Sequence, residues 1–250
     1  MSKYMIKLTR RPKPPELTDE VVNELTQEYK LSKSSVWNRP FIKDALMLMS
    51  HSKCAYCEVK LDHRGSNMEV EHYHPKSLYE NEVVEWSNLL PSCKRCNASK
   101  GSHDTKAAPI VNPFIDDPRD HLELKQFRYN HITGIGKTTK EELNLNDVDI
   151  QRDRFLISLT ASQTLEKLSN LLEQYLSGNK NSTRTRNNIV RGIEILLHEA
   201  GPESEYSAIV STTLLSHELW TPMEEELKAQ GLWSQMMEDR KNLALSTAYI

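Results

Sequence analysis

The sequence has no long apolar run, and apolar residues make up only 38% of its 250 residues. No stretch approaches the roughly 18 consecutive apolar residues that a membrane-spanning helix requires. The amino end also has no apolar stretch of signal-peptide length. We therefore expect a cytoplasmic protein that makes no membrane contact and has a modest core beneath much polar surface.

Cysteine is scarce, and its four residues all lie between positions 54 and 96. In the reducing cytoplasm that we expect for this chain, disulfides do not persist. The four cysteines therefore need an explanation other than disulfide bonding.

A strong net charge is also absent, since the formal net charge is -3. Two local basic clusters are more informative than this total, one at the amino end and one at the last cysteines: Lys3, Lys7, Arg10, Arg11 and Lys13, then Lys94, Arg95, Lys100 and Lys106. Such clusters suit contact with a polyanion. Taken alone, they are more typical of a solvated surface.

A complete phosphate-binding glycine loop is missing as well. Residues 131–138 (HITGIGKT) resemble a P-loop, but His131 stands where the first glycine is required, and no apolar strand precedes it. We therefore expect no nucleotide binding by this chain and assign Gly134 and Gly136 to a hairpin.

Along the chain, residues 1–50 predict an extended basic arm broken by prolines and followed by two short helices. The first helix is expected to begin after Thr18 as N-cap and to end near Lys30, and the second follows Pro40. Residues 51–106 hold all four cysteines and five of the nine histidines. That concentration marks this segment as the part that carries the chemistry.

Residues 107–146 predict a proline-rich linker and then a hairpin, with Leu122, Leu124 and Phe127 beside a turn near Asn130. Residues 147–250 show the periodicity of amphipathic helices. Their apolar stripes are Ile157, Ala161, Leu165, Leu168, Leu172 and Tyr175; Ile189, Ile193, Leu196 and Leu197; and Tyr206, Ile209, Val210, Thr213 and Leu214. Such stripes form a core or a docking surface for a partner, and the chain as a whole predicts an α+β fold.

Two CxxC pairs, Cys54–Cys57 and Cys93–Cys96, are separated by residues 58–92. Four thiolates complete the tetrahedral coordination of zinc, which leaves no open position on the metal. A thioredoxin-like redox site would usually have a single CxxC pair. The spacing therefore predicts a structural Zn²⁺ site that holds an inserted segment.

The insert contains residue types that phosphodiester hydrolysis requires. A water molecule must lose a proton, and His72 titrates near neutral pH as a base for that step. Glu71 and Asn97 offer the oxygen ligands that a hard divalent cation prefers. Because Cys93 and Cys96 tie the helix that follows to the zinc, Asn97 is fixed relative to His72.

The order CxxC, acid-His-x-x-Pro, Asn-Leu and CxxCNxxKG resembles the HNH endonucleases, which have the ββα-metal fold. This resemblance implies that His72 is the general base and that Glu71 and Asn97 bind the catalytic ion. It makes Asn88 the residue that holds the loop and orients His72, and it places Lys100 near the substrate phosphate. His74 either contacts phosphate or closes the loop.

Two departures from the family pattern bear on the metal. Glu71 stands where aspartate is commoner, and Asn97 stands where many members have histidine, which favours Mg²⁺ or Mn²⁺ over a softer metal. The remaining histidines are expected to have no catalytic role, namely His51, His63, His103, His121, His131, His198 and His217.

A wider resemblance covers the arm from Met5 to Leu17, the segment Val111-Asn112-Pro113 and the segment from Tyr206 to Val210. These segments resemble PtuB, the HNH subunit of Septu-type antiphage systems, including those attached to retrons. This resemblance implies a toxic nuclease controlled by a separate ATPase subunit, PtuA, with the carboxy-terminal helices as the docking surface.

We therefore expect a nuclease that acts on nucleic acid, with DNA favoured over RNA. Cleavage of tRNA or another RNA stays open, because hydrolysis by water does not require a 2′-hydroxyl. Two non-enzymatic alternatives also stay open: a zinc-scaffolded nucleic-acid-binding or adaptor module, and a protein scaffold with a degenerate site.

Overall fold

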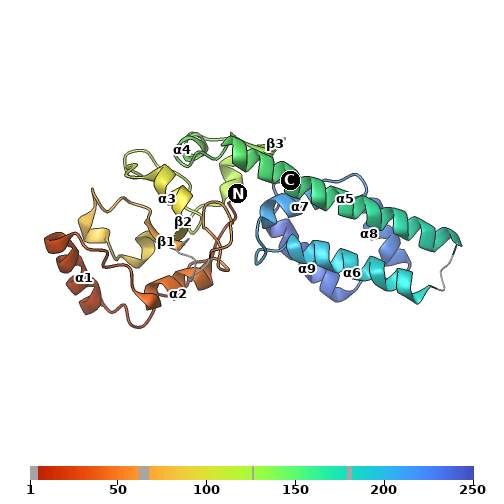
Figure 1. The fold of residues 1–250 in the computed structure, drawn as a ribbon, viewed down its shortest axis with the longest axis horizontal. Helices are drawn as coiled ribbons and strands as arrows, with labels where there is room; N and C mark the ends of the chain where they lie inside the picture. Colours follow the sequence, from red (N-terminus) through yellow and green to blue (C-terminus); the bar gives the residue numbers. More distant parts are fainter. Residues whose placement is uncertain (1–4, 62–67, 126, 179–181) are drawn as a thin grey trace. The chain divides into compact units, whose positions relative to one another are not determined.

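The computed structural model describes residues 5–61, 68–125, 127–178 and 182–250. Lys3 and His63, named above, lie outside the described residues. The chain forms two compact units whose boundary along the sequence falls between Asp147 and Val148 (Figure 1). We call them the amino-terminal unit and the helical unit and describe each by itself.

The amino-terminal unit is built around two strands and a short helix. Strand β1 (Met68–His72) pairs antiparallel with β2 (Leu89–Cys93), in a register that sets Glu71 opposite Leu90. Helix α3 (Lys94–Lys100) follows β2 without a break and packs against both strands. This is the β-β-α arrangement that the sequence predicted.

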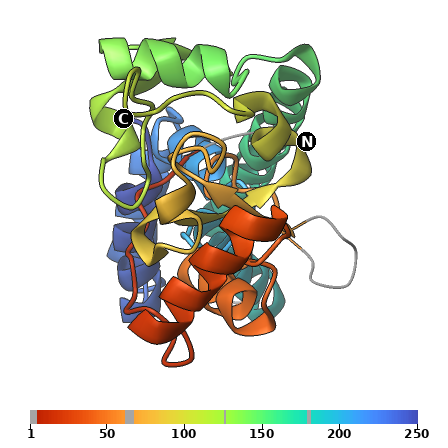
Figure 2. The same ribbon diagram turned by 90° about the vertical axis from the view of Figure 1, so that its left-hand side faces the viewer.

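Helices α1 (Asp19–Ser32) and α2 (Pro40–Met49) precede the strands, and both were predicted. The Thr18 hydroxyl accepts a hydrogen bond from the backbone N–H of Val21, which caps α1. Helix α2 packs its buried face, which includes Ile42 and Leu46, against β2. Figures 1 and 2 show α1 and α2 toward one end of this unit and α4 (Gly134–Glu142) toward the other.

The described part of the basic arm has no helix or strand, as expected, and Lys7, Arg11 and Lys13 are exposed, but its apolar side chains and Arg10 pack against the unit. The apolar residues of the arm are buried: Met5, Ile6 and Leu8. The Arg10 guanidinium donates to the carbonyl oxygens of Trp86 (2.6 Å) and Leu89 (3.2 Å) and lies 4.2 Å from the Phe114 ring centre. Burial lowers the pKa of Arg10 to about 10. Arg10 therefore fastens the arm to the strand region and does not serve as a surface contact for a polyanion.

The segment 107–120 is not a linker, which corrects the prediction. Ile110 and Val111 are fully buried, and the backbone carbonyl of Ile110 accepts a hydrogen bond from the Tyr73 hydroxyl (2.5 Å). The carbonyl of Pro113 accepts from the N–H of Leu8 (2.8 Å). The prolines suggested a free connection, but the apolar residues between them fill the core of this unit.

The predicted hairpin is present, with a different turn. Strand β3 (Leu122–Lys125) pairs with β4 (Arg128–His131), and Asn130 lies within β4 opposite Glu123. Asn130 therefore lies within a strand and not at the turn.

Gly134 and Gly136 were expected in a hairpin, and both instead belong to α4, which is capped by Thr133. A Cβ atom at Gly136 would lie 1.9 Å from the carbonyl oxygen of His121. The glycine is needed there because the helix approaches that backbone closely.

The helical unit contains α5 (Val148–Gly178), α6 (Thr183–Glu199), α7 (Ser207–Leu215), α8 (Trp220–Ala229) and α9 (Gln235–Thr247). The long α5 packs against α6 and α7, and α9 packs against the same two helices (Figure 1). The first three helices were predicted from their stripes, whose residues are mostly buried. No helix in the described residues is both long and apolar enough to cross a bilayer.

Candidate active site

The four cysteines come together as predicted. One sulfur from each residue lies within 4.8 Å of every other, and the Cys57 and Cys93 sulfurs are 3.7 Å apart. Zinc–sulfur bonds of about 2.3 Å in a tetrahedron imply sulfur–sulfur distances of about 3.8 Å. The donor set and its size therefore fit a zinc ion.

Backbone hydrogen bonds hold the first CxxC pair against β2. The N–H of Ala55 donates to the carbonyl of Pro91, and the N–H of Cys54 donates to that of Val59, both at 2.9 Å. Burial raises the pKa of the Cys57 and Cys96 thiols well above the ordinary value. These thiols need a cation beside them to ionise, which a zinc ion supplies.

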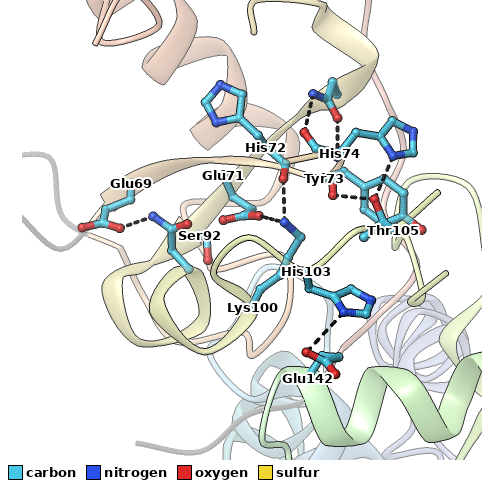
Figure 3. A network of polar contacts seen from close by, with 12 residues as sticks. Glu69, Glu71, His72, Tyr73, His74, Ser92, Lys100, His103, Thr105 and Glu142 are labelled. Carbon is cyan, nitrogen blue, oxygen red and sulfur yellow. Dashed lines mark hydrogen bonds and ion pairs between the residues drawn. The ribbon is translucent and has the colours of Figure 1, made fainter. Parts of the chain in front are cut away.

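The alternation of β1 decides where its side chains point. Glu69 and Glu71 extend toward α3, where Glu69 accepts a hydrogen bond from the Asn97 amide and Glu71 lies 2.6 Å from the Lys100 ammonium (Figure 3). His72 extends from the opposite face of the strand (Figure 3). The acidic side chains and the histidine thus approach the site from two directions.

His72 is held by a backbone carbonyl and an aromatic ring. Its Nε2 lies 2.8 Å from the carbonyl oxygen of Val83, and its ring packs edge-on against Trp37 with 4.7 Å between ring centres. A carbonyl only accepts, so Nε2 carries the proton and Nδ1 holds the free lone pair. Burial lowers the pKa of His72 to about 3, with the Lys76 ammonium acting in the same direction. The ring is therefore neutral at pH 7, and the expectation that His72 titrates near neutral pH is wrong, because the ring is buried.

One cavity joins the three residues that were expected to work together. It has a volume of about 260 Å³, and its lining includes Glu71, His72 and Asn97 beside Lys76 and Gly101. His72 and Glu71 extend from opposite faces of β1, and both line this cavity.

Lys100 is placed differently from the expectation that it lies near substrate phosphate. Its side chain is fully buried, and its ammonium contacts the Glu71 carboxylate at 2.6 Å and the carbonyl of His72 at 2.7 Å. The buried ion pair between Lys100 and Glu71 thus links α3 to β1. Burial raises the pKa of Glu71 to about 7, against the opposing effect of the Lys100 charge.

Asn88 fastens the loop that carries the Val83 carbonyl. Its side-chain oxygen accepts from the N–H of His74 (2.7 Å), and its amide donates to the carbonyls of His74 and Glu82 (both 3.1 Å). Glu82 is the neighbour of Val83, so Asn88 acts on the segment that holds the His72 ring. It does not contact that ring itself.

His74 belongs to a separate network, visible at the right of Figure 3. The Thr105 hydroxyl donates to the carbonyl of Tyr73 and therefore accepts from Nδ1 of His74, both at 2.8 Å. Burial lowers the pKa of His74 below its usual value. These contacts close the loop, and the Nε2 atom makes no hydrogen bond within the described residues.

The other described histidines do not line the cavity. His103 is partly buried and bridges the carbonyl of Ala108 (2.7 Å) and the Glu142 carboxylate (3.3 Å). His217 accepts the N–H of Leu219 on Nδ1, so its Nε2 donates to the Ser162 hydroxyl (2.8 Å). That direction excludes His217 as the base of a serine nucleophile.

Four groups near the site were not singled out from the sequence: Glu69, Lys76, Trp37 and the carbonyl of Val83. Strand alternation would have found Glu69, which lies two residues before Glu71 on the same face. Lys76 directly follows the motif proline. No sequence signal marks Trp37 or Val83, because they reach His72 only through the tertiary fold.

Comparison with known proteins agrees with this geometry. Residues 54–103 match the family model of the HNH endonuclease. The chain is 42% identical to the Septu protein PtuB of Bacillus thuringiensis over 231 residues, which cover 92% of this chain and 90% of that protein.

A second relative is the Septu protein PtuB of Bacillus mycoides (strain KBAB4), which is 27% identical over 213 residues, covering 68% of this chain and 72% of the relative. No solved structure matches the chain significantly. The matched family segment contains both CxxC pairs, the acid-histidine pair and Asn97. The chain is therefore a nuclease with an HNH endonuclease domain, and it belongs to the PtuB family of Septu proteins.

Proposed function

We propose that this chain hydrolyses phosphodiester bonds of DNA at the cavity shared by Glu71, His72 and Asn97. The observation that carries the proposal is that one small cavity collects a neutral histidine, a carboxylate and an amide beside a helix fixed by the four-cysteine site. DNA is favoured over RNA by the family resemblance and by the basic residues around the site.

In this proposal His72 is the general base. Its Nε2–H group keeps its proton and donates a hydrogen bond to the Val83 carbonyl. Its Nδ1 takes a proton from a water molecule as that water attacks phosphorus. The bond to the 3′ oxygen breaks, which leaves a 5′-phosphate and a 3′-hydroxyl. Trp37 and the loop held by Asn88 keep the ring oriented during the reaction.

Glu71 and Asn97 are the proposed ligands of Mg²⁺ or Mn²⁺. Their oxygen donors fit a hard cation, and the Asn97 Oδ1 makes no hydrogen bond in the part of the chain that the structure describes. Glu69, which accepts from the same amide, is a third oxygen donor beside them. A bound divalent ion would supply positive charge to the phosphate and to the leaving oxygen.

We further propose that the helical unit binds an ATPase subunit of the PtuA type and that the pair acts in cytoplasmic antiphage defence. The support is the resemblance to Septu systems and an apolar groove of about 480 Å³ between α5, α6 and α7. Leu156 and Ile195 line the groove and are 50% and 55% exposed. Apolar side chains this exposed are typical of a protein contact.

Incubation of the purified chain with plasmid DNA and Mg²⁺, with and without the ATPase subunit from the same operon, tests the proposal. We expect nicking or linearisation by the wild type and none by Glu71→Gln. A parallel reaction with tRNA distinguishes the RNA alternative. Binding of nucleic acid without cleavage of any substrate, with the partner present, would instead establish the non-catalytic module.

A further inference from the structure

A second cavity adjoins the one that holds the catalytic residues. It measures about 410 Å³ and is lined by the amino-terminal helical region and β1, with Trp37, Asn38 and Lys43 facing Glu69. Lys76 and Asn97 line both cavities. The two hollows therefore adjoin at these side chains, and we refer to them together as the groove.

In the described part of the chain, the lysines of this groove have no acidic partner, unlike some of the lysines around it. Nearby lysines are paired with acids, as in Lys33–Glu80 and Lys106–Glu82. Lys43 and Lys76 form no ion pair with any acid among the described residues. Two acids line the groove: Glu69, which accepts the Asn97 amide, and Glu71, which pairs with Lys100. Two unpaired ammonium groups in one hollow suit an anionic ligand.

Lys76 is also held in place. Its ammonium lies 4.8 Å from the centre of the Trp37 ring, the same ring that packs edge-on against His72. A cation over an indole face is a stabilising contact. The Trp37 ring thus helps to orient both the proposed base, His72, and the Lys76 ammonium. The charge of Lys76 also lowers the pKa of Glu71 and that of His72.

We propose that Lys43 and Lys76 bind the phosphate next to the scissile one, so that the substrate strand runs through this groove and past His72. The assignment rests on the proposed function, because it takes the scissile phosphate to lie at Glu71 and Asn97. Trp37 is a positioning residue, because its ring contacts the Lys76 ammonium.

Fluorescence anisotropy with a labelled DNA duplex tests this assignment without any cleavage. All proteins carry His72→Ala, and Mg²⁺ is omitted. The variants are Lys43→Gln, Lys76→Gln and the two together, with Lys125→Gln as the matched control, since Lys125 is 68% exposed and lies on β3 in the same unit.

Each phosphate contact that is lost should reduce the slope of log Kd against log salt by about 0.9. Because the two lysines share one phosphate, we expect a reduction of about 0.9 for the double variant and no more than that for either single variant, with no change for the control. Equal slopes in the double variant and the control would overturn the assignment, and so would absence of DNA binding by the parent protein. Binding as expected, together with a wild type that cuts no nucleic acid, would refute the proposed function and the placement beside a scissile phosphate, and would leave the two lysines as a phosphate contact.

Discussion

The Nε2 atom of His72 lies 2.8 Å from the carbonyl oxygen of Val83. This single contact fixes which ring nitrogen is protonated and leaves Nδ1 as the basic atom. It also makes the orientation of the base depend on the loop between Pro75 and Asn88, which contains none of the residues assigned to catalysis. The loop is held by Asn88, so the asparagine of the motif acts on the histidine through the backbone between them.

Asn88→Ala should reduce cleavage and stability together. The substitution leaves the N–H and carbonyl of His74 and the carbonyl of Glu82 without their partner. Each buried polar group that loses its partner costs about 1–3 kcal/mol. Urea unfolding and single-turnover cleavage measure the two effects, and Ser87→Ala, at an exposed neighbour, is the control. If the variant unfolds at a lower urea concentration but cleaves like the wild type, Asn88 does not influence the orientation of His72.

Removal of one cysteine should remove the zinc. Dialysed wild type is expected to hold one Zn²⁺ per chain, whereas Cys57→Ser should hold substoichiometric zinc and lose cleavage, because the helix that carries Asn97 is no longer fixed. Metal analysis by atomic absorption checks this. Full zinc content in the variant would show that the four sulfurs do not form the site.

Lys100→Met should destabilise the amino-terminal unit by about 3–5 kcal/mol, because it leaves the Glu71 carboxylate buried without its counter-ion. Adding Glu71→Gln to this variant should restore part of the loss, since no unpaired charge then remains. Denaturant unfolding of the wild type, both single variants and the double variant gives the coupling free energy between Lys100 and Glu71. If the two losses simply add, the pair is not coupled as the structure indicates.

The Mg²⁺ requirement should depend on pH through Glu71. Its pKa is raised to about 7, so below that pH a proton occupies the carboxylate and competes with the ion. The half-saturating Mg²⁺ concentration should rise about tenfold for each pH unit below 7 and should be constant above it. His72, with a pKa of about 3, stays neutral throughout this range. Cleavage rates across Mg²⁺ concentrations from about pH 5.5 to about pH 8.5 provide the test.

The sequence was most informative where spacing alone determines geometry. Two CxxC pairs can satisfy one metal only if the chain returns between them, so the zinc site was predictable from spacing, whereas the strand–strand–helix core was implied by the resemblance to HNH endonucleases. The helices with leucine or isoleucine stripes were predictable for a similar reason. Helix α9 was not predicted, because its buried positions include Met237, Ala244 and Thr247 and form no such stripe.

The errors fall where tertiary contacts override local composition. Arg10 lies in a cluster of basic residues typical of a surface, but its guanidinium contacts two carbonyl oxygens and an aromatic ring and is partly buried. Lys100 was assigned to the substrate phosphate by the family resemblance, yet its ammonium pairs with the buried Glu71 carboxylate. Neither partner could be located without knowing which segments meet in space.

Single-turnover cleavage of a labelled duplex by His72→Ala and His74→Ala, each compared with the wild type in Mg²⁺ and with the ATPase subunit present, tests the central claim most directly. General-base catalysis contributes about 10²-fold or more, so His72→Ala should be slower by at least that factor. His74→Ala, which loses the bond to Thr105 and the edge-on ring contacts with Tyr73 and Tyr79, should retain most of the rate. A His72→Ala variant that cleaves as fast as the wild type would contradict the assignment of this histidine as the base.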